Sequence, residues 1–531
     1  MSPDMTLPTS FDTVVIGAGS AGAALAARLT EDQSRRVLLV ESGPDYRSGA
    51  TPALVTALDV MPMSTDPQTL QRLYYPTLTA SHAAGRAPRP YLRGRGVGGS
   101  SAINGLFAIR PTVEDLDDWA AAGLAGWSYD QLLPLLNRLE NDQEFGTADY
   151  HGSEGPIPVV RPAVESCQPL DLAFAESAQA VGHKLTADHN APGASGVSPY
   201  AFNALGGRRV STNDGYLEPA RDRANLTIVG DTVVDVVLIE NGRAVGVRGS
   251  CGGQPVEYHA SEVVLSAGAV HSPTILLRSG IGPAEELRGL GIAVVADLPV
   301  GKGLQDHAAL VLASGLSERG RTRPNDGRHS RFCLRFDLGV SDDAKDGMIV
   351  AMTSHHLPEA GVLVGWVNRV ESRGTVRLAS TDPGADPVVE LNMLDAEVDR
   401  RRMRRVVEEM EAIARQAAFR DVSTGGGLAD GLDGFLITPE TTLLQGSELS
   451  DREFDSYAAR NVTDTQHCTS TCAMGLDPET SVVDPQGRVH GIEGLRVADA
   501  SIVPWVPRAN THVTAVLVGE KIADDMRGGT R

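Results

Sequence analysis

A strand–turn–helix pattern near the N-terminus constrains the fold of this chain more than any other feature. The β-branched run at residues 12–16 leads into a GxGxxG turn at Gly17, and an alanine-rich stretch with strong helix propensity follows. A second apolar run, at residues 37–40, ends in Glu41, 19 residues after the last glycine of the turn. This order and spacing predict a dinucleotide-binding βαβ unit.

Each residue type in this pattern has a physical role. Gly17 permits the tight turn, Gly19 lets the backbone approach a pyrophosphate, and Gly22 lets the helix pack on the strand. The N-terminus of the helix stabilises the anion. Glu41 is expected to accept hydrogen bonds from the adenosine ribose, and its charge opposes a 2′-phosphate, so NADP is disfavoured. The unit alone does not distinguish FAD from NAD.

A second glycine cluster, RGRGVGGSSAIN, occupies residues 93–104. It also fits the GxGxxG string, but no clean strand precedes it, so we interpret it as a different kind of loop. Its glycines, with Ser100 and Ser101, suit a loop that lays backbone N–H groups and hydroxyls against a phosphate or a flat ring. A plain surface loop is the alternative.

Composition excludes several classes of protein. The chain has 531 residues, 41% hydrophobic and 22% charged, enough for a globular protein of two or more domains or one elaborated domain. A net charge of −21 disfavours nucleic acid and anionic lipid surfaces as partners. Five scattered cysteines fit a reducing compartment, and there is neither a signal-peptide pattern nor an apolar run of ~18 residues. We therefore expect a cytoplasmic protein without membrane insertion.

The rest of the chain divides by pattern. Residues 226–247 indicate strands around a hairpin at Asn241, and these fit a doubly wound sheet. From 316 to 395 the strand-like pieces, such as 374–378, predict a second, antiparallel domain. Residues 396–418 predict an amphipathic helix with Val398, Met403, Val406, Met410 and Ile413 on one face, and the glycines at 425–427 predict a mobile loop.

Eight motifs in this sequence resemble the glucose–methanol–choline (GMC) oxidoreductase family, closest to bacterial hydroxymethylfurfural-oxidase-like and alcohol dehydrogenase members. They are GAGSAG at 17, RGVGGSSAIN at 95, GRRVSTNDGYLEPAR at 207, SAGAVHSPTILLRSGIGP at 266, VGKGLQDH at 300, SRGTVRL at 372, HCTSTCAMG at 467 and VHGIEGLRVADASIVP at 489. The resemblance implies an α/β fold, with a Rossmann-type FAD-binding domain and a second α+β substrate domain on an antiparallel sheet. We assign residues 1–160, 206–315 and 458–531 to the first domain, and 161–205 and 316–457 to the second.

The resemblance also implies which residues contact FAD. The ADP half would meet Gly17, Gly19, Ser20, Gly22 and Glu41, with Val234 touching adenine through its backbone. The pyrophosphate and flavin would meet Arg95, Gly96, Gly99, Ser100, Ala102, Asn104 and Ala267, with Asp499 and Ala500 near the ribityl chain and His512 and Val513 near the pyrimidine edge. Ile103 stands where some members attach FAD through a histidine, so we expect noncovalent FAD.

The resemblance further implies that an alcohol is oxidised and that His467 and His512 are the catalytic residues. Hydride leaves an alcohol carbon readily only as the hydroxyl proton is withdrawn, which requires a base with a pKa near neutrality. His467 is our base, and His512 would hydrogen-bond the substrate oxygen. The other eleven histidines are interpreted as structural. Gln466 replaces the aromatic residue that relatives usually carry beside the base, so we expect a more polar or more open substrate wall.

Several alternatives stay open at this stage. A hydroxynitrile-lyase-type carbon–carbon lyase exists on the same fold, and a flavin-binding protein without turnover would share the cofactor motifs. No metal is expected, because His467, Cys468 and Cys472 have no evident fourth ligand for zinc. The sequence does not give the alcohol, the electron acceptor (O₂ or another) or the oligomeric state.

Overall fold

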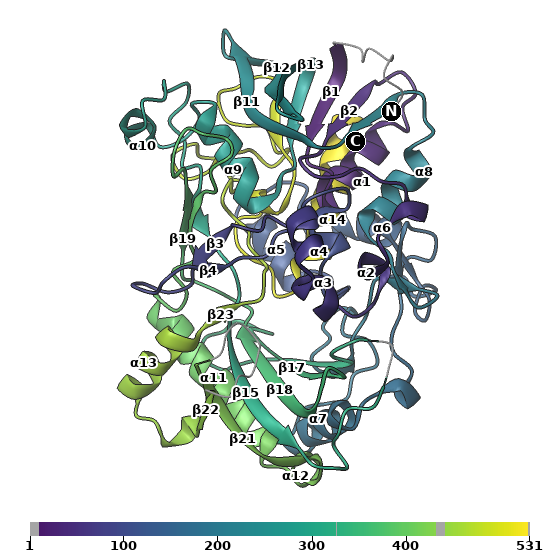
Figure 1. Ribbon diagram of the computed structural model, residues 1–531, viewed down its shortest axis with the longest axis vertical. Coiled ribbons are helices and arrows are strands. Elements are labelled where there is room, and N and C mark those ends of the chain that lie inside the picture. Colours follow the sequence, from purple (N-terminus) through teal and green to yellow (C-terminus); the bar gives the residue numbers. More distant parts are fainter. Residues whose placement is uncertain (1–9, 325–326, 432–440, 529–531) are drawn as a thin grey trace.

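The N-terminal pattern folds as predicted in the computed structural model, which describes residues 10–324, 327–431 and 441–528 (Figure 1). β1 (Ser10–Ile16) lies between β2 (Val37–Val40) and β13 (Gln254–Leu265), parallel to both, and α1 (Ser20–Leu29) follows the turn. All four residues of β2 are buried, as expected for a strand covered on both faces. The βαβ prediction is therefore confirmed.

The sheet around β1 has seven strands, in the order β10-β2-β1-β13-β12-β11, with β24 also paired to β13. The further strands are β10 (Leu226–Val229), β11 (Thr232–Glu240), β12 (Arg243–Cys251) and β24 (Leu495–Val497). β11 and β12 form the predicted hairpin, and Asn241 and Gly242 have the positive φ angles, 50° and 79°, of a tight turn. Because β11, β12 and β13 run antiparallel, the sheet is mixed rather than purely parallel.

A second, antiparallel sheet of eight strands forms the other end of the molecule (Figure 1). Its order is β22-β21-β15-β18-β17-β16-β7, with β23 paired to β15. The strands are β7 (Gly196–Pro199), β15 (Ala308–Leu316), β16 (Phe332–Phe336), β17 (Gly347–Ser354), β18 (Leu357–Val367), β21 (Ser423–Asp430), β22 (Thr442–Leu444) and β23 (Thr463–Asp464). This sheet confirms the predicted second architecture.

The predicted amphipathic helix packs on that sheet. α11 (Glu397–Ala414) buries Met403, Val406, Met410 and Ile413. It approaches β18 closely at Gly365, where a Cβ atom would lie 2.5 Å from a methyl carbon of Val406. The neighbouring helices at this end are α7 (Pro169–Ala180), α12 (Ala417–Val422) and α13 (Asp451–Asn461).

Two local expectations were wrong. The glycines at 425–427 lie in β21, paired with β15, and not in a mobile loop. A side chain at Gly426 would meet the Ala313 carbonyl at 2.4 Å, so the close strand pairing itself requires glycine. Residues Gly374–Arg377 do form a strand, β19, but it belongs to a separate five-stranded sheet of β14 (Lys302–Leu304), β19, β20 (Val388–Glu390), β3 (Thr79–Ser81) and β4 (Arg89–Pro90).

The domain boundaries remain a proposal. β15 begins at Ala308 and belongs to the antiparallel sheet, so sheet membership favours a boundary near residue 307 over one at 315. By the same reasoning β23 favours 465 over 458 for the return to the first domain.

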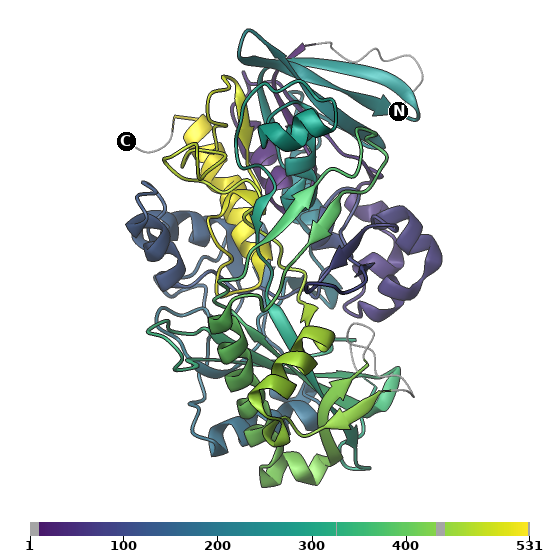
Figure 2. The same ribbon diagram turned by 90° about the vertical axis from the view of Figure 1, so that its left-hand side faces the viewer.

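The C-terminal helix packs against the N-terminal βαβ unit. α14 (Thr511–Met526), yellow in Figure 2, packs against α1 so closely that a Cβ at Gly519 would lie 2.3 Å from the Ala21 carbonyl oxygen. The other helices are α2 (Ala53–Thr56), α3 (Met61–Thr65), α4 (Pro67–Leu73), α5 (Val113–Ala121), α6 (Tyr129–Leu139), α8 (Glu218–Ala220), α9 (Gly268–Arg278) and α10 (Ala284–Gly289). Within the described ranges, none of the helices combines the length and the apolar character needed to cross a bilayer.

Candidate active site

A cavity of about 510 Å³ lies where the carboxyl ends of the parallel strands face the antiparallel sheet. Ile16, Val40 and Ser266 line it from the first sheet, and Val350 and Trp366 line it from the second. Open α/β sheets bind ligands at this edge, because the strand ends and helix N-termini converge there.

Most of the predicted site residues line this cavity. They are His467 and His512, together with Gly17, Gly19, Ser20, Glu41, Arg95, Gly99, Ser100, Asn104, Val234, Ala267, Asp499 and Ala500. The structure therefore brings together residues that are up to 495 positions apart, from Gly17 to His512.

Four predicted residues lie behind the lining instead. A Cβ at Gly22 would lie 1.9 Å from the Gly17 carbonyl oxygen, which is the helix-on-strand contact expected of that glycine. Gly96 donates its N–H to Glu41, Ala102 packs in a cluster with Val55, and Val513 is part of the main core.

The turn into α1 has the features of an anion site. Gly17 has φ +100°, and a Cβ there would lie 2.4 Å from the Ser266 carbonyl oxygen, so only glycine fits. Gly19 caps the helix without a side chain, and the first turn contains no acidic residue. The free N–H groups of that turn are therefore available to a phosphate.

Glu41 is held in a fixed position by four donors of the protein. Its Oε1 accepts from the backbone N–H groups of Gly43 and Gly96, both at 2.9 Å, and from the Ser42 hydroxyl at 3.0 Å. Its Oε2 accepts from the Ala18 N–H at 2.8 Å. One carboxylate thus joins the end of β2 to both glycine loops. Oε2 keeps lone-pair capacity for a ligand hydroxyl.

The Asp499 carboxylate, also in the lining, is held by protein donors in the same way. Its Oδ2 accepts from the Gly268 N–H at 2.9 Å and the Ser272 hydroxyl at 2.6 Å, and its Oδ1 accepts from the Ser501 N–H at 2.8 Å. Burial raises the pKa of this carboxyl, against the lowering effect of those donors. Ala267, beside this network, is thereby positioned at the start of α9.

The predicted base, His467, is buried among polar side chains. Its Nδ1 lies 2.9 Å from Nδ1 of His307 and 2.7 Å from the Thr465 hydroxyl, and its Nε2 lies 3.0 Å from the amide nitrogen of Asn510. Burial, and then the charges of His307 and Arg93, lower the pKa of His467 well below its usual value. The ring is therefore neutral at physiological pH.

The contacts of His307 fix which nitrogen of His467 carries the proton. His307 Nε2 lies 3.0 Å from the Pro507 carbonyl oxygen, which can only accept, so this nitrogen donates. Burial lowers the pKa of His307 to about 4, so the ring is neutral and its Nδ1 is an acceptor. The proton between the two Nδ1 atoms then belongs to His467. Nε2 of His467 keeps its lone pair and accepts from Asn510.

His512 lies in the first turn of α14. Its Nδ1 is 3.1 Å from the Ser20 hydroxyl in α1, and its Nε2 makes no hydrogen bond with residues that the structure describes. Burial, with a smaller effect of Arg209, lowers its pKa to about 4, so this imidazole too is neutral. His512 and His467 line the same cavity but are not hydrogen-bonded to each other within the described structure.

Gln466, beside the predicted base, also lines the cavity. Its φ of +62° is unusual for a residue other than glycine, and its carbonyl accepts from the Arg93 guanidinium at 2.9 Å. The peptide before His467 is thus held by an arginine that itself lines the cavity.

The sequence did not single out His307 or Asn510. Asn510 is the N-cap residue of α14 but makes no capping hydrogen bond, because its oxygen accepts from the Tyr200 hydroxyl at 3.1 Å and its nitrogen donates to His467. An asparagine before a helix is usually interpreted as a cap, which hides such a role. The motif VGKGLQDH contained the signal for His307, as a histidine in a family motif.

The cavity fits FAD by its own chemistry. A helix N-terminus without a side-chain cap and side-chain-free glycines offer N–H groups to a pyrophosphate, and Glu41 offers an acceptor to a ribose. Two neutral imidazoles lie in the lining at His467 and His512.

Comparison with known proteins identifies the family of this chain. Two family models described as GMC oxidoreductase match residues 11–309 and 370–519. The chain is 36% identical to the oxygen-dependent choline dehydrogenase of Cronobacter sakazakii, over 98% of this chain and 95% of the relative. It is 34% identical to the 5-(hydroxymethyl)furfural oxidase of Methylovorus sp., over 97% and 98%.

A comparison of structures also finds similar proteins. The crystal structure of pyridoxine 4-oxidase from Mesorbium loti superposes with a TM-score of 0.87 and 28% identity, covering 98% of this chain and all of the other. The expected fold class, an FAD-binding α/β part with a second sheet-based part, is confirmed. The chain therefore belongs to the GMC oxidoreductases, a family of FAD-dependent flavoproteins.

Proposed function

We propose that the protein oxidises a small alcohol to the aldehyde or ketone, with His467 Nε2 as the base that accepts the hydroxyl proton. The observation that carries this proposal is the buried, neutral His467, whose proton is held on Nδ1 by His307 so that the lone pair of Nε2 is available. FAD, bound noncovalently as Ile103 suggests, supplies the acceptor for the hydride that leaves the alcohol carbon.

Asn510 and His512 complete the site in this proposal. Asn510 donates to Nε2 of His467 in the structure, so a substrate hydroxyl would replace the amide as partner of that nitrogen. The Nε2 of His512, which has no protein partner among the described residues, would donate to the substrate oxygen as its charge develops. The free N–H groups at the start of α14 would stabilise negative charge that develops next to this helix N-terminus.

The cavity wall favours an uncharged arylmethyl alcohol over a cationic amino alcohol. The antiparallel sheet contributes Val350, Met352, Val364 and Trp366, and Phe107 adds a further aromatic ring. Two carboxylates in the lining, Glu41 and Asp499, accept from protein donors. The third, Asp386, lies near Tyr75, whose hydroxyl is 2.8 Å from that of Ser42 at the Glu41 end of the cavity. Beside His467, the Asp306 carboxyl accepts from the His467 backbone N–H at 2.8 Å and lies 3.8 Å from the Arg93 guanidinium, so this carboxyl is paired and is not offered to a cationic substrate. Two of the similar proteins are named as oxidases of hydroxymethylfurfural and of pyridoxine, and both compounds are uncharged arylmethyl alcohols of the favoured kind.

The test is an anaerobic panel of alcohols, monitored at the absorbance of oxidised flavin. Arylmethyl alcohols should bleach the flavin faster than choline, and air admitted afterwards shows whether O₂ restores the colour. His467→Ala should slow the bleaching by roughly 10²–10⁴-fold and retain FAD, the usual scale for a positioned general base.

Two results would contradict the proposal. Bleaching by the His467→Ala variant at a near-normal rate would remove His467 as the base. Consumption of a substrate without any bleaching would favour a lyase reaction, although the relatives compared above are named as dehydrogenases and oxidases.

A further inference from the structure

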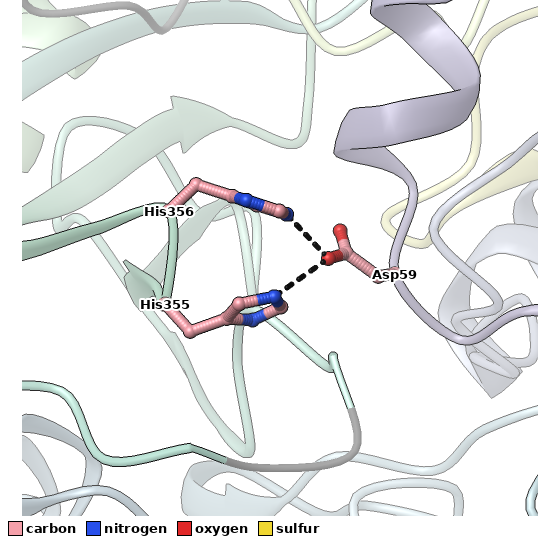
Figure 3. Close-up of side chains that lie close together, drawn as sticks. All are labelled: Asp59, His355 and His356. Atoms are coloured by element: carbon pink, nitrogen blue, oxygen red, sulfur yellow. Dashed lines mark hydrogen bonds and ion pairs between the residues drawn. The ribbon is translucent and has the colours of Figure 1, made fainter.

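Three histidines converge on one aspartate outside the cavity described above. Asp59 lies in the loop between α2 and α3, and His355 and His356 form the turn between β17 and β18. Figure 3 shows both imidazoles directed at the same carboxylate oxygen of Asp59. His329 approaches the carboxylate from a third segment, with Nε2 3.1 Å from Oδ1.

The spacing of the donor atoms is that of a small coordination site. Nε2 of His356 lies 2.9 Å from Asp59 Oδ2, and Nε2 of His355 lies 3.4 Å from the same oxygen. All three donors lie within 4.8 Å of one another. Ligands at the corners of a tetrahedron around zinc, with bonds of about 2.0–2.1 Å, are separated by about 3.3 Å. The three atoms are thus already near the positions that such an ion requires.

The chemistry of the three donors selects the kind of ion. Two imidazole nitrogens and one carboxylate oxygen suit zinc and the late first-row divalent metals better than calcium or magnesium, which prefer all-oxygen sites. We propose that Asp59, His355 and His356 bind one such divalent ion, with water completing the coordination shell.

The surroundings support both binding and access. The N–H of Met61 donates to Asp59 Oδ1 at 2.9 Å, which orients the carboxylate and leaves Oδ2 toward the two imidazoles. The side chains of His355 and His356 are 33% and 46% exposed, so an ion can enter from solvent. Neither Nδ1 atom has a partner in the described part of the chain, so each can carry the proton that Nε2 must give up.

The ion would tie two walls of the catalytic cavity together. The strands that flank the histidine turn contribute Met352 and Trp366 to the cavity lining. The helices beside Asp59 pack in a cluster with Ile103, which also lines the cavity. A metal-dependent increase in thermal stability is therefore expected. The site itself contains no residue of the proposed catalytic machinery.

The experiment uses the full-length, FAD-loaded protein without a histidine tag, treated with a chelator and then titrated with Co²⁺ as a spectroscopic probe for the zinc site. The wild type should bind one ion per chain with the visible d–d absorption of a tetrahedral nitrogen–oxygen site, and Zn²⁺ should displace it. Asp59→Asn should weaken binding roughly tenfold or more while retaining the oxygen that accepts from Met61. The double variant His355→Ala/His356→Ala should abolish the saturable site.

His259→Ala, at an exposed histidine of β13, is the matched control and should bind as the wild type does. The proposal is overturned if the wild type binds no Co²⁺ saturably, or if the Asp59 and double-histidine variants bind it as the wild type does. Either result would mean that the three side chains form a hydrogen-bonded cluster only. Because the readout is metal binding, it is independent of whether the protein oxidises alcohols.

Discussion

At the scale of single residues, the site depends on a proton whose position is fixed by a second histidine. That His467 and His512 lie in the cavity lining could be predicted from sequence, because each stands in a recognisable segment. The roles of His307 and Asn510 could not, because they depend on contacts across 160 and 43 residues of chain. Only the tertiary structure shows that the Pro507 carbonyl, through His307, sets the tautomer of His467, the proposed base.

This arrangement makes His307 a positioning residue with a testable effect. His307→Leu removes the imidazole acceptor of His467 Nδ1–H and leaves only the Thr465 hydroxyl beside that nitrogen, so the proton can move to Nε2 and block the proposed base. We expect flavin reduction to slow by roughly 10²-fold, less than the ~10⁴-fold that a wrong tautomer costs a triad histidine. His307→Gln supplies an amide oxygen as acceptor and should recover part of the rate.

The measurement is the anaerobic reduction rate at saturating alcohol, with FAD content determined in parallel. The ¹⁵N chemical shifts of the His467 ring report the tautomer directly and would not change if His307 were only structural. Equal rates for the wild type and the Leu variant, with an unchanged tautomer, would contradict this role.

At the scale of secondary-structure elements, regular packing could be predicted better than unusual pairing. The βαβ unit, the hairpin at Asn241 and α11 follow from periodicity and turn chemistry, which are local properties. The strand at 425–427 was missed because three consecutive glycines indicate a loop. In the structure, the absence of side chains at these glycines lets β21 lie close to β15 on one side and to β22 on the other. A Cβ at Gly427, for example, would lie 2.6 Å from the Leu444 carbonyl oxygen.

The carboxylate that joins β2 to the glycine loops gives a prediction at this scale. In Glu41→Gln, an NH₂ group replaces one oxygen and must face the donors of Gly43, Gly96 or Ala18, which leaves buried N–H groups without an acceptor. We expect the purified variant to carry less FAD, with an affinity at least tenfold weaker. Such a loss corresponds to about 1.4 kcal/mol.

The ratio of flavin to protein absorbance and a fluorescence titration of the apoprotein with FAD measure this effect. Glu240→Gln, at the exposed end of β11, makes the same chemical change outside the site and should leave FAD affinity unchanged. If the Glu41→Gln variant binds FAD as tightly as this control, the hydrogen bonds that the Glu41 carboxylate accepts are not needed for FAD binding.

At the scale of the whole molecule, the chain forms the two sheet-based parts that the sequence predicted. The sequence pattern does not define the exact residues at which the chain passes from one part to the other. Strands such as β7 and β23 consist of four and two residues, and they join a sheet whose other members lie far along the chain. Short edge pairings of this kind leave little periodicity to detect.

Burial of histidines throughout the molecule gives a last prediction, on the pH dependence of stability. His189 is buried, donates from Nδ1 to the Pro199 carbonyl at 3.0 Å, and lies outside the cavity lining. Burial, and then Arg335, lower its pKa from 6.5 to about 3. Below pH 6.5 the unfolded chain takes up a proton here that the folded chain does not, so this residue's contribution to stability falls as the pH falls.

His189→Asn should therefore be destabilised most at pH 7.5, where the wild type gains the full benefit of the neutral imidazole. At pH 5 the free energy of unfolding of the wild type is lower by about 2 kcal/mol because of this residue. The difference in unfolding free energy between wild type and variant should therefore shrink by about that amount. Urea unfolding of both proteins at the two pH values, with saturating FAD, measures the difference and cancels the other titrating groups. His259→Asn makes the same substitution at an exposed position and is the matched control. A deficit for His189→Asn that stays constant between pH 7.5 and 5 would mean that the folded protein accommodates a charged His189.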